Sequence, residues 1–466
     1  MNLRRITVPE YDTISIVPSL DAVETKKSKS ISEQEAKLVN AFQKRSGQTF
    51  FNIGLQMLAT TNWVGSFSIG YLCIDVIPKI DTEKPLAMKN LLQMVSAGGV
   101  EKFKHTDISC LAKTDTPLIT AFLELYINNL RKEWIRGPIR RYVSEEANRF
   151  FLKGKIIFSR HLRQNVFHHE RFFTASDEFT ADNPVSRLLK AALNVCRAYP
   201  LAPHVSTQAK KLLCLFDEVS DERDAAKCLS EITIDRTTFR FQYLINLAKC
   251  VIERVSPWKQ SLKVPVYSLM FDMNEVFEKF VAAELKRALT ENGYKVITQS
   301  ATRYLATRDD SPQLKPKRVF WLKPDISVFN PKVIQGRPAC LVDTKWKMLR
   351  ILENEEFRPN KSGDSREPVP QADMYQMYAY AHKYKCPVIL IYPHHSGLPL
   401  QKQPLASPFL KYDCGDEEEP YTIVVCTVDI TIDLVRARER ESFRWSLLKL
   451  VQDIGQAPSR ADESHV

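Results

Sequence analysis

The sequence predicts a multidomain protein with a β-rich N-terminal domain, a mainly α-helical middle region and a C-terminal α/β domain. The chain has 466 residues, which is enough for two or three domains. Its first hundred residues contain short apolar runs that glycines interrupt, a pattern typical of a strand meander. Helical periodicity dominates residues 116–262, and the last third mixes helices with short, strongly apolar runs. We therefore expect domains over residues 1–112, 113–262 and 263–466.

Capping signals predict where several helices begin. In the N-terminal domain, Ser32 and Glu35 have the spacing of a capping box for a helix over residues 31–43. In the middle region, Asn183 followed by Pro184 predicts the start of another helix. The segment FDMNEVFEKFVAAELKRALTENG predicts a long helix at the start of the C-terminal domain, with Glu278 near its middle.

The middle region also contains a run of basic residues. Such a run suits a phosphate backbone or the acidic face of a protein partner. A solvated helix face explains it equally well. The run consists of Arg140, Arg141, Arg149, Lys153, Lys155, Arg160 and Arg163.

Two apolar segments of the C-terminal domain carry candidate catalytic residues. RVFWLKPDISVF (residues 318–329) and ACLVDTKWKML (339–349) each predict a buried strand. Side chains alternate across a strand, so Asp343 and Lys345 are expected on one face. If the two strands are adjacent and antiparallel, Asp325 lies near Asp343.

Charged side chains in an apolar sheet need a partner or a metal ion. Asp325 and Asp343 are hard oxygen ligands that suit Mg²⁺, and the backbone carbonyl of Thr344 is a possible further ligand. Lys345 would orient a water or stabilise charge on a phosphate. The alternative for each aspartate alone is a turn cap or a local ion pair.

Three further residues are supporting candidates. Glu278 would reach the site from its helix; a surface glutamate is the equally weighted alternative. Gln371 and Tyr375 lie four residues apart on one helical face, where they would support the site or touch DNA. Packing of Tyr375 in the core is the alternative.

Composition narrows the class of protein. The net charge of +11 and the pI of about 9.0 favour a polyanionic partner, nucleic acid first. Ten scattered cysteines without a C-x-x-C pair disfavour a zinc site or a disulfide scaffold, and they indicate a reducing, cytoplasmic environment. No apolar run is long enough to span a membrane. The chain lacks a phosphate-binding loop motif, so we expect it to bind no nucleotide itself.

The site residues resemble the motif of the PD-(D/E)XK nuclease superfamily. Pro324 and Asp325 match its first half, and Asp343, Thr344 and Lys345 match its second half. Some members of that superfamily also carry a Q-x-x-x-Y helix, which Gln371 and Tyr375 match. The resemblance implies a restriction-endonuclease-like fold for residues 263–466.

Four longer motifs extend this comparison: FDMNEVFEKFV, LKPDI, LVDTKWK and QADMYQMYAYA. With them, the sequence is similar over most of its length to the McrC family, the nuclease subunits of McrBC-type 5-methylcytosine-dependent restriction systems. The resemblance implies a Mg²⁺-dependent endodeoxyribonuclease, with Asp325, Asp343 and Lys345 catalytic. It also implies a partner, a McrB-like AAA+ GTPase ring, which the N-terminal domain (1–112) contacts and stimulates. The DNA would be double-stranded and methylated.

Two other functions remain open at this stage. One is a non-catalytic assembly or GTPase-activating subunit, and the other is a DNA-binding protein with a relic nuclease fold. The complete P-D…D-x-K set disfavours the relic.

Overall fold

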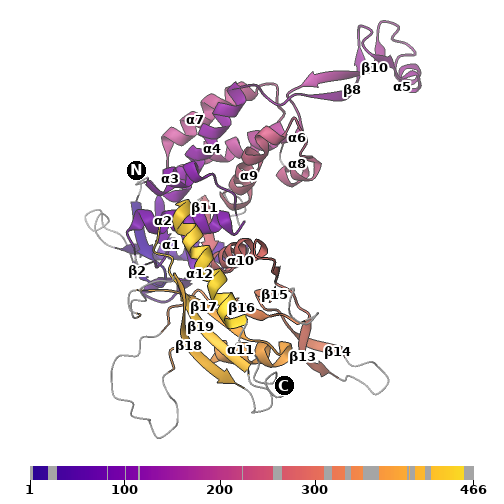
Figure 1. Ribbon diagram of the computed structural model, residues 1–466. Helices are drawn as coiled ribbons and strands as arrows, with labels where there is room; N and C mark the ends of the chain where they lie inside the picture. The colour runs from indigo at the N-terminus through magenta and orange to yellow at the C-terminus, as the bar shows by residue number, and fades with distance from the viewer. Residues whose placement is uncertain are drawn as a thin grey trace.

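The computed structural model describes residues 4–18, 29–80, 82–99, 101–113, 116–222, 224–255, 265–308, 317–330, 337–349, 367–395, 398, 405–414 and 421–455. The molecule is elongated, and two N-terminal sheets lie between a stack of helices and a C-terminal sheet (Figure 1). An arm projects from the far end of the helical stack. The mixed α/β, multidomain character expected from the sequence is confirmed.

Two four-stranded sheets form the N-terminal part. The first has the order β1 (Arg4–Pro9), β7 (Leu72–Ile77), β6 (Trp63–Ile69) and β11 (Val266–Asp272). The second has the order β3 (Ser30–Ser32), β2 (Thr13–Val17), β5 (Met57–Thr60) and β4 (Phe51–Ile53). Helix α1 (Glu33–Ser46) shares an apolar core with both sheets.

The predicted capping box is present at the start of α1. The side chain of Ser32 accepts a hydrogen bond from the backbone N–H of Glu35, and the carboxylate of Glu35 accepts one from the backbone N–H of Ser32. These contacts satisfy two backbone N–H groups that the first turn leaves without helical partners.

Strand β11 follows the middle region in sequence but pairs antiparallel with β6 of the N-terminal sheet. The pairing is close at Gly65, where φ is +136° and an added Cβ would lie 2.0 Å from the carbonyl oxygen of Leu269. Directly after β11, Asp272 caps α10 (Met273–Thr290) and also accepts a hydrogen bond of 2.5 Å from Asn62. The helix that carries Glu278 therefore starts at the N-terminal sheet, although its sequence lies within residues 263–466.

Helices make up the centre of the middle region, as predicted. Asn183 caps α6 and Pro184 occupies its first turn, which confirms that prediction. The helices of this region and the junction before it are α2 (Lys84–Ala97), α3 (His105–Lys113), α4 (Leu118–Ile135), α6 (Pro184–Ala198), α7 (Pro203–Leu213), α8 (Ala225–Glu231) and α9 (Gln242–Cys250). Short 3₁₀ turns lie at Cys214–Phe216 and Phe239–Phe241, and a π-helical turn at Val251–Val255 follows α9.

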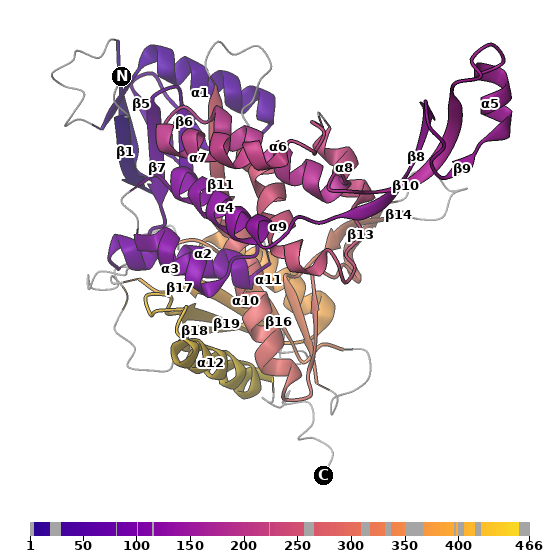
Figure 2. The same cartoon turned by 90° about the horizontal axis from the view of Figure 1, so that it is seen from above.

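The arm was not predicted from the helical periodicity of this region. It consists of the antiparallel strands β8 (Arg141–Arg149) and β10 (Phe172–Thr180), the short β9 (Lys155–Ile156) and α5 (Phe158–Gln164). Figure 2 shows it extending sideways from the helices. Most of the basic run therefore lies on strands or in the arm, and the interpretation as one solvated helix face was wrong.

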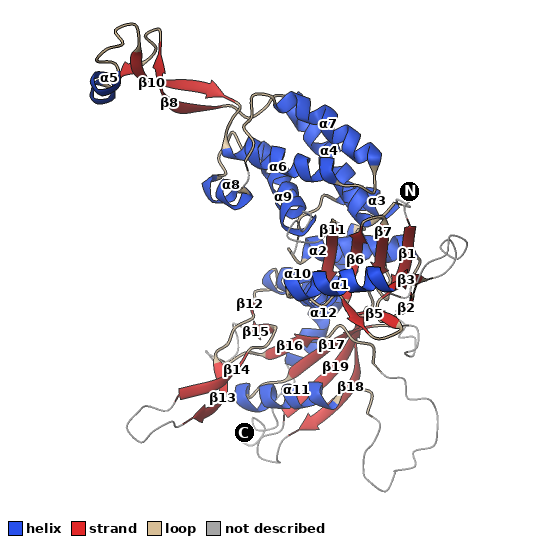
Figure 3. Cartoon of the chain, turned by 180° about the vertical axis from the view of Figure 1, so that it is seen from behind, coloured by secondary structure: helices blue, strands red, loops and turns tan. Residues whose placement is uncertain are grey.

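The C-terminal part is a six-stranded mixed sheet between helices (Figure 3). Its strand order is β12 (Lys295–Thr298), β15 (Ile326–Phe329), β16 (Cys340–Thr344), β17 (Val388–Pro393), β19 (Tyr421–Val428) and β18 (Ala406–Cys414). One face packs on α10 and α12 (Ala437–Gly455), and the other on α11 (Gln371–Tyr384). The alternation of Leu341 and Val342 between these two cores shows that β16 is buried on both faces.

Residues 318–329 form two strands rather than the single buried strand expected. Only β15 enters the sheet, while β14 (Lys317–Leu322) pairs with β13 (Arg303–Arg308) in a separate two-stranded ribbon. The strands are divided at Pro324, which has no backbone N–H to donate to a ladder. Phe320 and Trp321 indicated a strand correctly, but aromatic content does not determine burial, and both are at least half exposed.

All ten cysteines are free, and the four expected in the core (Cys73, Cys340, Cys386 and Cys426) are buried. Among the described residues, no helix combines the length and apolarity that crossing a bilayer requires.

Candidate active site

Asp325 and Asp343 come together at the edge where β15 and β16 pair. Ile326 lies opposite Val342 in the antiparallel register, so the residues beyond them are neighbours. Asp325 occupies the bend immediately before β15, and its Oδ2 accepts hydrogen bonds from the backbone N–H (2.9 Å) and the hydroxyl (3.1 Å) of Thr344. Thr344 thus fixes the orientation of Asp325; the role of its carbonyl oxygen stays a prediction.

Lys345 completes the group. Its ammonium lies 2.5 Å from Oδ2 of Asp343, whose side chain is almost fully buried. The backbone N–H of Lys345 donates to the carbonyl oxygen of Ile391 at 2.9 Å, which continues the alignment with β17 beyond the end of β16. Strand alternation therefore orients Asp343 and Lys345 together, as expected from their spacing.

The charges of the site perturb one another. Burial, followed by the nearby charge of Asp325, raises the pKa of Asp343 to about 7. Burial also raises the pKa of Asp325, although Thr344 and Lys345 oppose the rise. Burial by itself lowers the pKa of Lys345, but Asp343 and Asp325 outweigh that effect and raise it overall. The site consequently holds more negative charge than one lysine neutralises.

Glu278 reaches this site from α10. The side-chain amide of Gln299 donates to Glu278 and also to Oδ1 of Asp325, at 3.3 Å, so it bridges the two carboxylates. Burial and then the charge of Asp325 raise the pKa of Glu278. Gln299 was not predicted from the sequence. It follows β12 with φ of +54°, and only the pairing of β12 with β15 brings it beside Asp325.

Gln371 and Tyr375 lie on the first turns of α11, where the Gln371 amide donates to the Tyr375 hydroxyl at 2.5 Å. Tyr375 is 66% exposed, which excludes the alternative that it packs in the core. No contact of either residue with the two aspartates is among the interactions of the described residues. Instead, the neighbouring Asp373 binds Lys347 at 2.9 Å and accepts from the hydroxyl of Tyr392 at 2.9 Å.

A link to the N-terminal sheet was also missed. Trp346, next to Lys345, donates its indole N–H to Oε2 of Glu10 at 2.8 Å, and the backbone N–H of Lys79 donates to Oε1 at 2.8 Å. Trp346 also packs on Phe277 of α10, with ring centroids 5.3 Å apart. Burial raises the pKa of Glu10 to about 7. No local sequence signal connects residues that are more than three hundred positions apart.

The donor atoms fit a hard divalent cation. Asp325 and Asp343 offer carboxylate oxygens, and a cation between them would relieve the repulsion that raises their pKa values. Within the described ranges, no three His, Cys, Asp or Glu side chains are grouped closely enough to hold a metal ion alone. Magnesium commonly uses one or two carboxylates together with waters and substrate phosphates, which is the type of site these residues offer.

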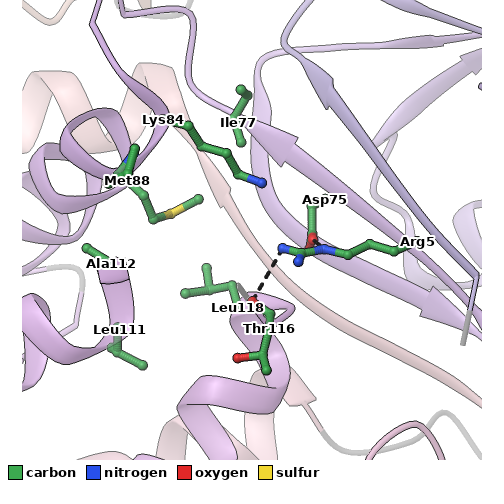
Figure 4. A pocket seen from close by; sticks show the side chains of 10 residues that line it. Arg5, Asp75, Ile77, Lys84, Met88, Leu111, Ala112, Thr116 and Leu118 are labelled. Carbon is green, nitrogen blue, oxygen red and sulfur yellow. Dashed lines mark hydrogen bonds and ion pairs between the residues drawn. The ribbon is translucent and has the colours of Figure 1, made fainter. Parts of the chain in front are cut away.

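A pocket elsewhere contains a second charged group. It lies where the first N-terminal sheet meets α2, α3 and the start of α4, and Lys84 and Met88 line it (Figure 4). There Arg5 forms an ion pair with the buried Asp75 and donates to the carbonyl oxygen of Thr116 at 3.3 Å. Asp75 also accepts from Ser66. The pairing of these charges indicates a structural role at the domain junction.

Comparisons with known proteins agree with the architecture. Residues 58–393 match the family model described as "McrBC 5-methylcytosine restriction system component". No curated protein sequence matches the chain.

One solved structure has the same fold along nearly the whole chain. A chain in the refined half-complex of Thermococcus gammatolerans McrB AAA+ hexamers with bound McrC has 19% identity and a TM-score of 0.67. The match covers 96% of this chain and 100% of that one. A chain of the Thermococcus gammatolerans McrBC complex has 20% identity and a TM-score of 0.49, over 61% of this chain and 88% of that one. Because the family model spans most of the sequence, the chain belongs to the family of McrBC 5-methylcytosine restriction system components, in agreement with its resemblance to McrC.

Proposed function

We propose that this chain is the Mg²⁺-dependent endodeoxyribonuclease subunit of a McrBC-like, modification-dependent restriction system. The C-terminal sheet would be a PD-(D/E)XK nuclease core. The observation that carries the proposal is the convergence of Asp325, Asp343 and Lys345 in a buried, net negative site at one sheet edge. Burial of such charges costs stability, so the arrangement is best explained by a catalytic role.

The reaction would be hydrolysis of a DNA phosphodiester. Attack of a water oxygen on phosphorus breaks the bond to the leaving oxygen, and the proton of the water passes to solvent or to a nearby base. Asp325 and Asp343 would hold magnesium, which when bound polarises the phosphate and lowers the pKa of a bound water. Lys345, held by Asp343, would stabilise the negative charge that develops on the phosphate. Glu278 and Gln299 would keep Asp325 in position.

The partner would be a McrB-like AAA+ GTPase ring that selects methylated double-stranded DNA. The solved complex of this fold contains McrB hexamers with bound McrC, which supports that assignment. The expectation from the sequence places the contact in residues 1–112, and Glu10, in the turn after β1, would then connect partner and nuclease site.

The arm offers a second contact surface for the same ring. It exposes large apolar side chains although it is far from any core, and such surfaces mark protein interaction sites. Its charges are mostly paired within the described structure, for example Arg149 with Glu145 and Arg160 with Glu146. The exposed side chains are Tyr142, Val143, Phe150, Phe151, Leu152, Phe158, Leu162, Val166, Phe167 and Phe179.

The test is DNA cleavage by the chain together with its ring partner, with GTP and Mg²⁺. Asp343→Asn should reduce cleavage at least about 100-fold and leave stimulation of GTP hydrolysis unchanged. Asp413→Asn is the matched control, because Asp413 is 70% exposed on β18 of the same sheet. Equal cleavage by the two variants would show that the assigned site is wrong.

The rival functions make a different prediction. A non-catalytic assembly or GTPase-activating subunit, or a DNA-binding protein with a relic nuclease fold, would show no cleavage by the wild-type complex at any Mg²⁺ concentration.

A further inference from the structure

The ribbon of β13 and β14 lies directly beside the candidate active site. It projects from the C-terminal sheet next to α11 (Figures 1 and 3). Strand β14 ends at Leu322, only three residues before Asp325. Any ligand that lies along the ribbon would therefore reach the catalytic carboxylates without crossing another element.

The surface of the ribbon is basic and aromatic. Residues 303–308 and 317–323 include five basic residues and no acidic residue. Large apolar side chains are exposed among them, with Phe320 71% and Trp321 50% accessible. Arg318 lies over the ring of Tyr304 at 5.1 Å, and Tyr304 packs edge-on against Trp321 at 5.8 Å. A guanidinium over one ring, with a second ring edge-on to the first, offers charge and apolar surface together, which suits contact with the phosphates and sugars of DNA.

The base of the ribbon is fixed in position by α11. The Tyr380 hydroxyl donates to the carbonyl oxygen of Lys323 at 3.1 Å, and the Tyr384 hydroxyl donates to that of Leu322 at 3.3 Å. Thr302, just before β13, also donates to the Tyr384 hydroxyl at 3.3 Å. A two-stranded ribbon is marginally stable alone, so these anchors determine its direction relative to Asp325.

Lys323 connects the ribbon to the site electrostatically. Burial and Asp325 raise the pKa of Glu278, and the positive charge of Lys323 partly opposes that rise. Arg303 lies opposite Leu322 in the register of the ribbon, so Arg303 and Lys323 are both basic residues at its base, and Arg318 is a further one nearer its tip.

We propose that the β13–β14 ribbon binds duplex DNA next to the cleaved phosphate and sets which phosphate enters the site. This inference rests on the proposed nuclease function and adds the surface that holds the substrate. The major groove admits a two-stranded ribbon, and Arg and Lys side chains would contact the flanking phosphates.

The comparison with the arm favours DNA over a protein as the ligand of the ribbon. On the arm, acidic side chains neutralise most of the basic ones, as Glu178 does for Lys153. The sequence of the ribbon, residues 303–323, has six basic residues and two acidic ones, a net charge of +4. Charge complementarity therefore assigns the polyanion to the ribbon.

Duplex affinity of the full-length chain tests the inference. Fluorescence anisotropy with a 5′-labelled duplex of about 30 base pairs is measured in EDTA, so that no cleavage occurs, over a range of salt concentrations. The variant Arg303→Gln/Arg318→Gln/Lys323→Gln should weaken binding about tenfold or more near 0.1 M salt. It should also reduce the slope of log affinity against log salt by about 2 to 3.

A matched variant removes three basic residues away from the ribbon, on the edge strand β18 and on α12. Lys411→Gln/Arg438→Gln/Lys449→Gln changes exposed side chains of β18 and α12, and it should retain wild-type affinity. Thermal melts establish that both variants fold. Arg303→Gln and Lys323→Gln are also measured singly, each with an expected slope change of about 1.

Three outcomes would overturn the inference: no duplex affinity of the wild-type chain, equal affinity of the two triple variants, or loss of GTPase stimulation by the ribbon variant with duplex affinity intact. The last result would make the ribbon a protein-binding surface. The readout is independent of catalysis, so failure of the Asp343→Asn cleavage test would contradict the proposed nuclease and leave the ribbon result interpretable.

Discussion

The candidate active site and the arm use opposite chemistry. The site buries charged groups, Asp343 above all, at an edge of an otherwise apolar sheet. The arm exposes apolar groups, such as Phe167 at 88% in the turn after α5, and has almost no core of its own. Each arrangement costs free energy in an isolated chain, by desolvation of charge in one case and hydration of apolar surface in the other. Under the proposed function, two ligands of different chemistry would complete the molecule: a cation with DNA at the site, and a protein at the arm.

The largest effect is expected at the site. Lys345→Met should lower the cleavage rate of the assembled complex by on the order of 10²–10³, because no other described cation pairs with Asp343. Single-turnover cleavage measures the rate. Lys411→Met, an exposed lysine on β18, is the control and should cleave normally. Normal cleavage by Lys345→Met would remove Lys345 from the catalytic group.

A smaller loss is expected when the arm is made polar. Phe151→Ser/Phe167→Ser should weaken the complex with the ring partner about ten- to a hundredfold, since exposed aromatic residues often dominate interfaces. The melting temperature should not change, because neither ring is part of a core. Affinity is measured by sedimentation or by titration of GTPase stimulation. If the titration is unchanged, the arm does not contact the ring partner, and residues 1–112 would form the contact by themselves.

A smaller effect is expected from the hydrogen bond between Glu10 and Trp346, which joins the N-terminal part of the molecule to the candidate active site. Glu10→Ala leaves the buried indole N–H of Trp346 without its acceptor and should reduce the free energy of unfolding by about 1–3 kcal/mol. Chemical denaturation measures it. Glu33→Ala on α1 is the control, because its half-exposed ion pair with Lys37 should contribute below about 0.5 kcal/mol. Equal stability of the two variants would show that the hydrogen bond between Trp346 and Glu10 does not stabilise the folded state.

The smallest expected effect, taken for each pH unit, is the pH dependence of stability. The pKa of Asp343 is raised to about 7 by burial and Asp325, so the folded state retains a proton that the unfolded state releases near pH 4. Stability from this group is present at low pH and is lost as the pH rises through about 7. In EDTA, Asp343→Asn should therefore gain stability relative to wild type as the pH rises from 4 to 7, on the order of 1 kcal/mol for each pH unit. If the stabilities of wild type and Asp343→Asn change in parallel with pH, the claim that burial raises the pKa of Asp343 is contradicted.

Local signals in the sequence predicted much of the fold and part of the site. Capping residues such as Ser32 and Asn183 act within four positions, so the starts of α1 and α6 could be predicted. The proximity of Asp325 to Asp343 followed from two neighbouring strands and a known alternation of side chains. The Q-x-x-x-Y spacing correctly placed Gln371 and Tyr375 on one helical face, and they contact each other.

What the sequence did not predict depends on contacts between distant segments. Gln299 reaches the site through a left-handed backbone conformation, which its residue type does not predict. Glu10 meets Trp346 only because β11 returns to the N-terminal sheet before α10 begins. The separation of β14 from β15 and the projection of the arm also depend on which strand finds which partner. Propensity does not encode that choice.

The most direct test of the central claim is divalent cation binding by the full-length chain, measured by calorimetry with Mn²⁺ and Mg²⁺ in the presence of a non-cleavable phosphorothioate duplex. The account predicts a site that is present in wild type and in Asp413→Asn and absent in Asp325→Asn/Asp343→Asn. Unchanged cation binding by the double variant would contradict the claim that these two carboxylates share a metal ion.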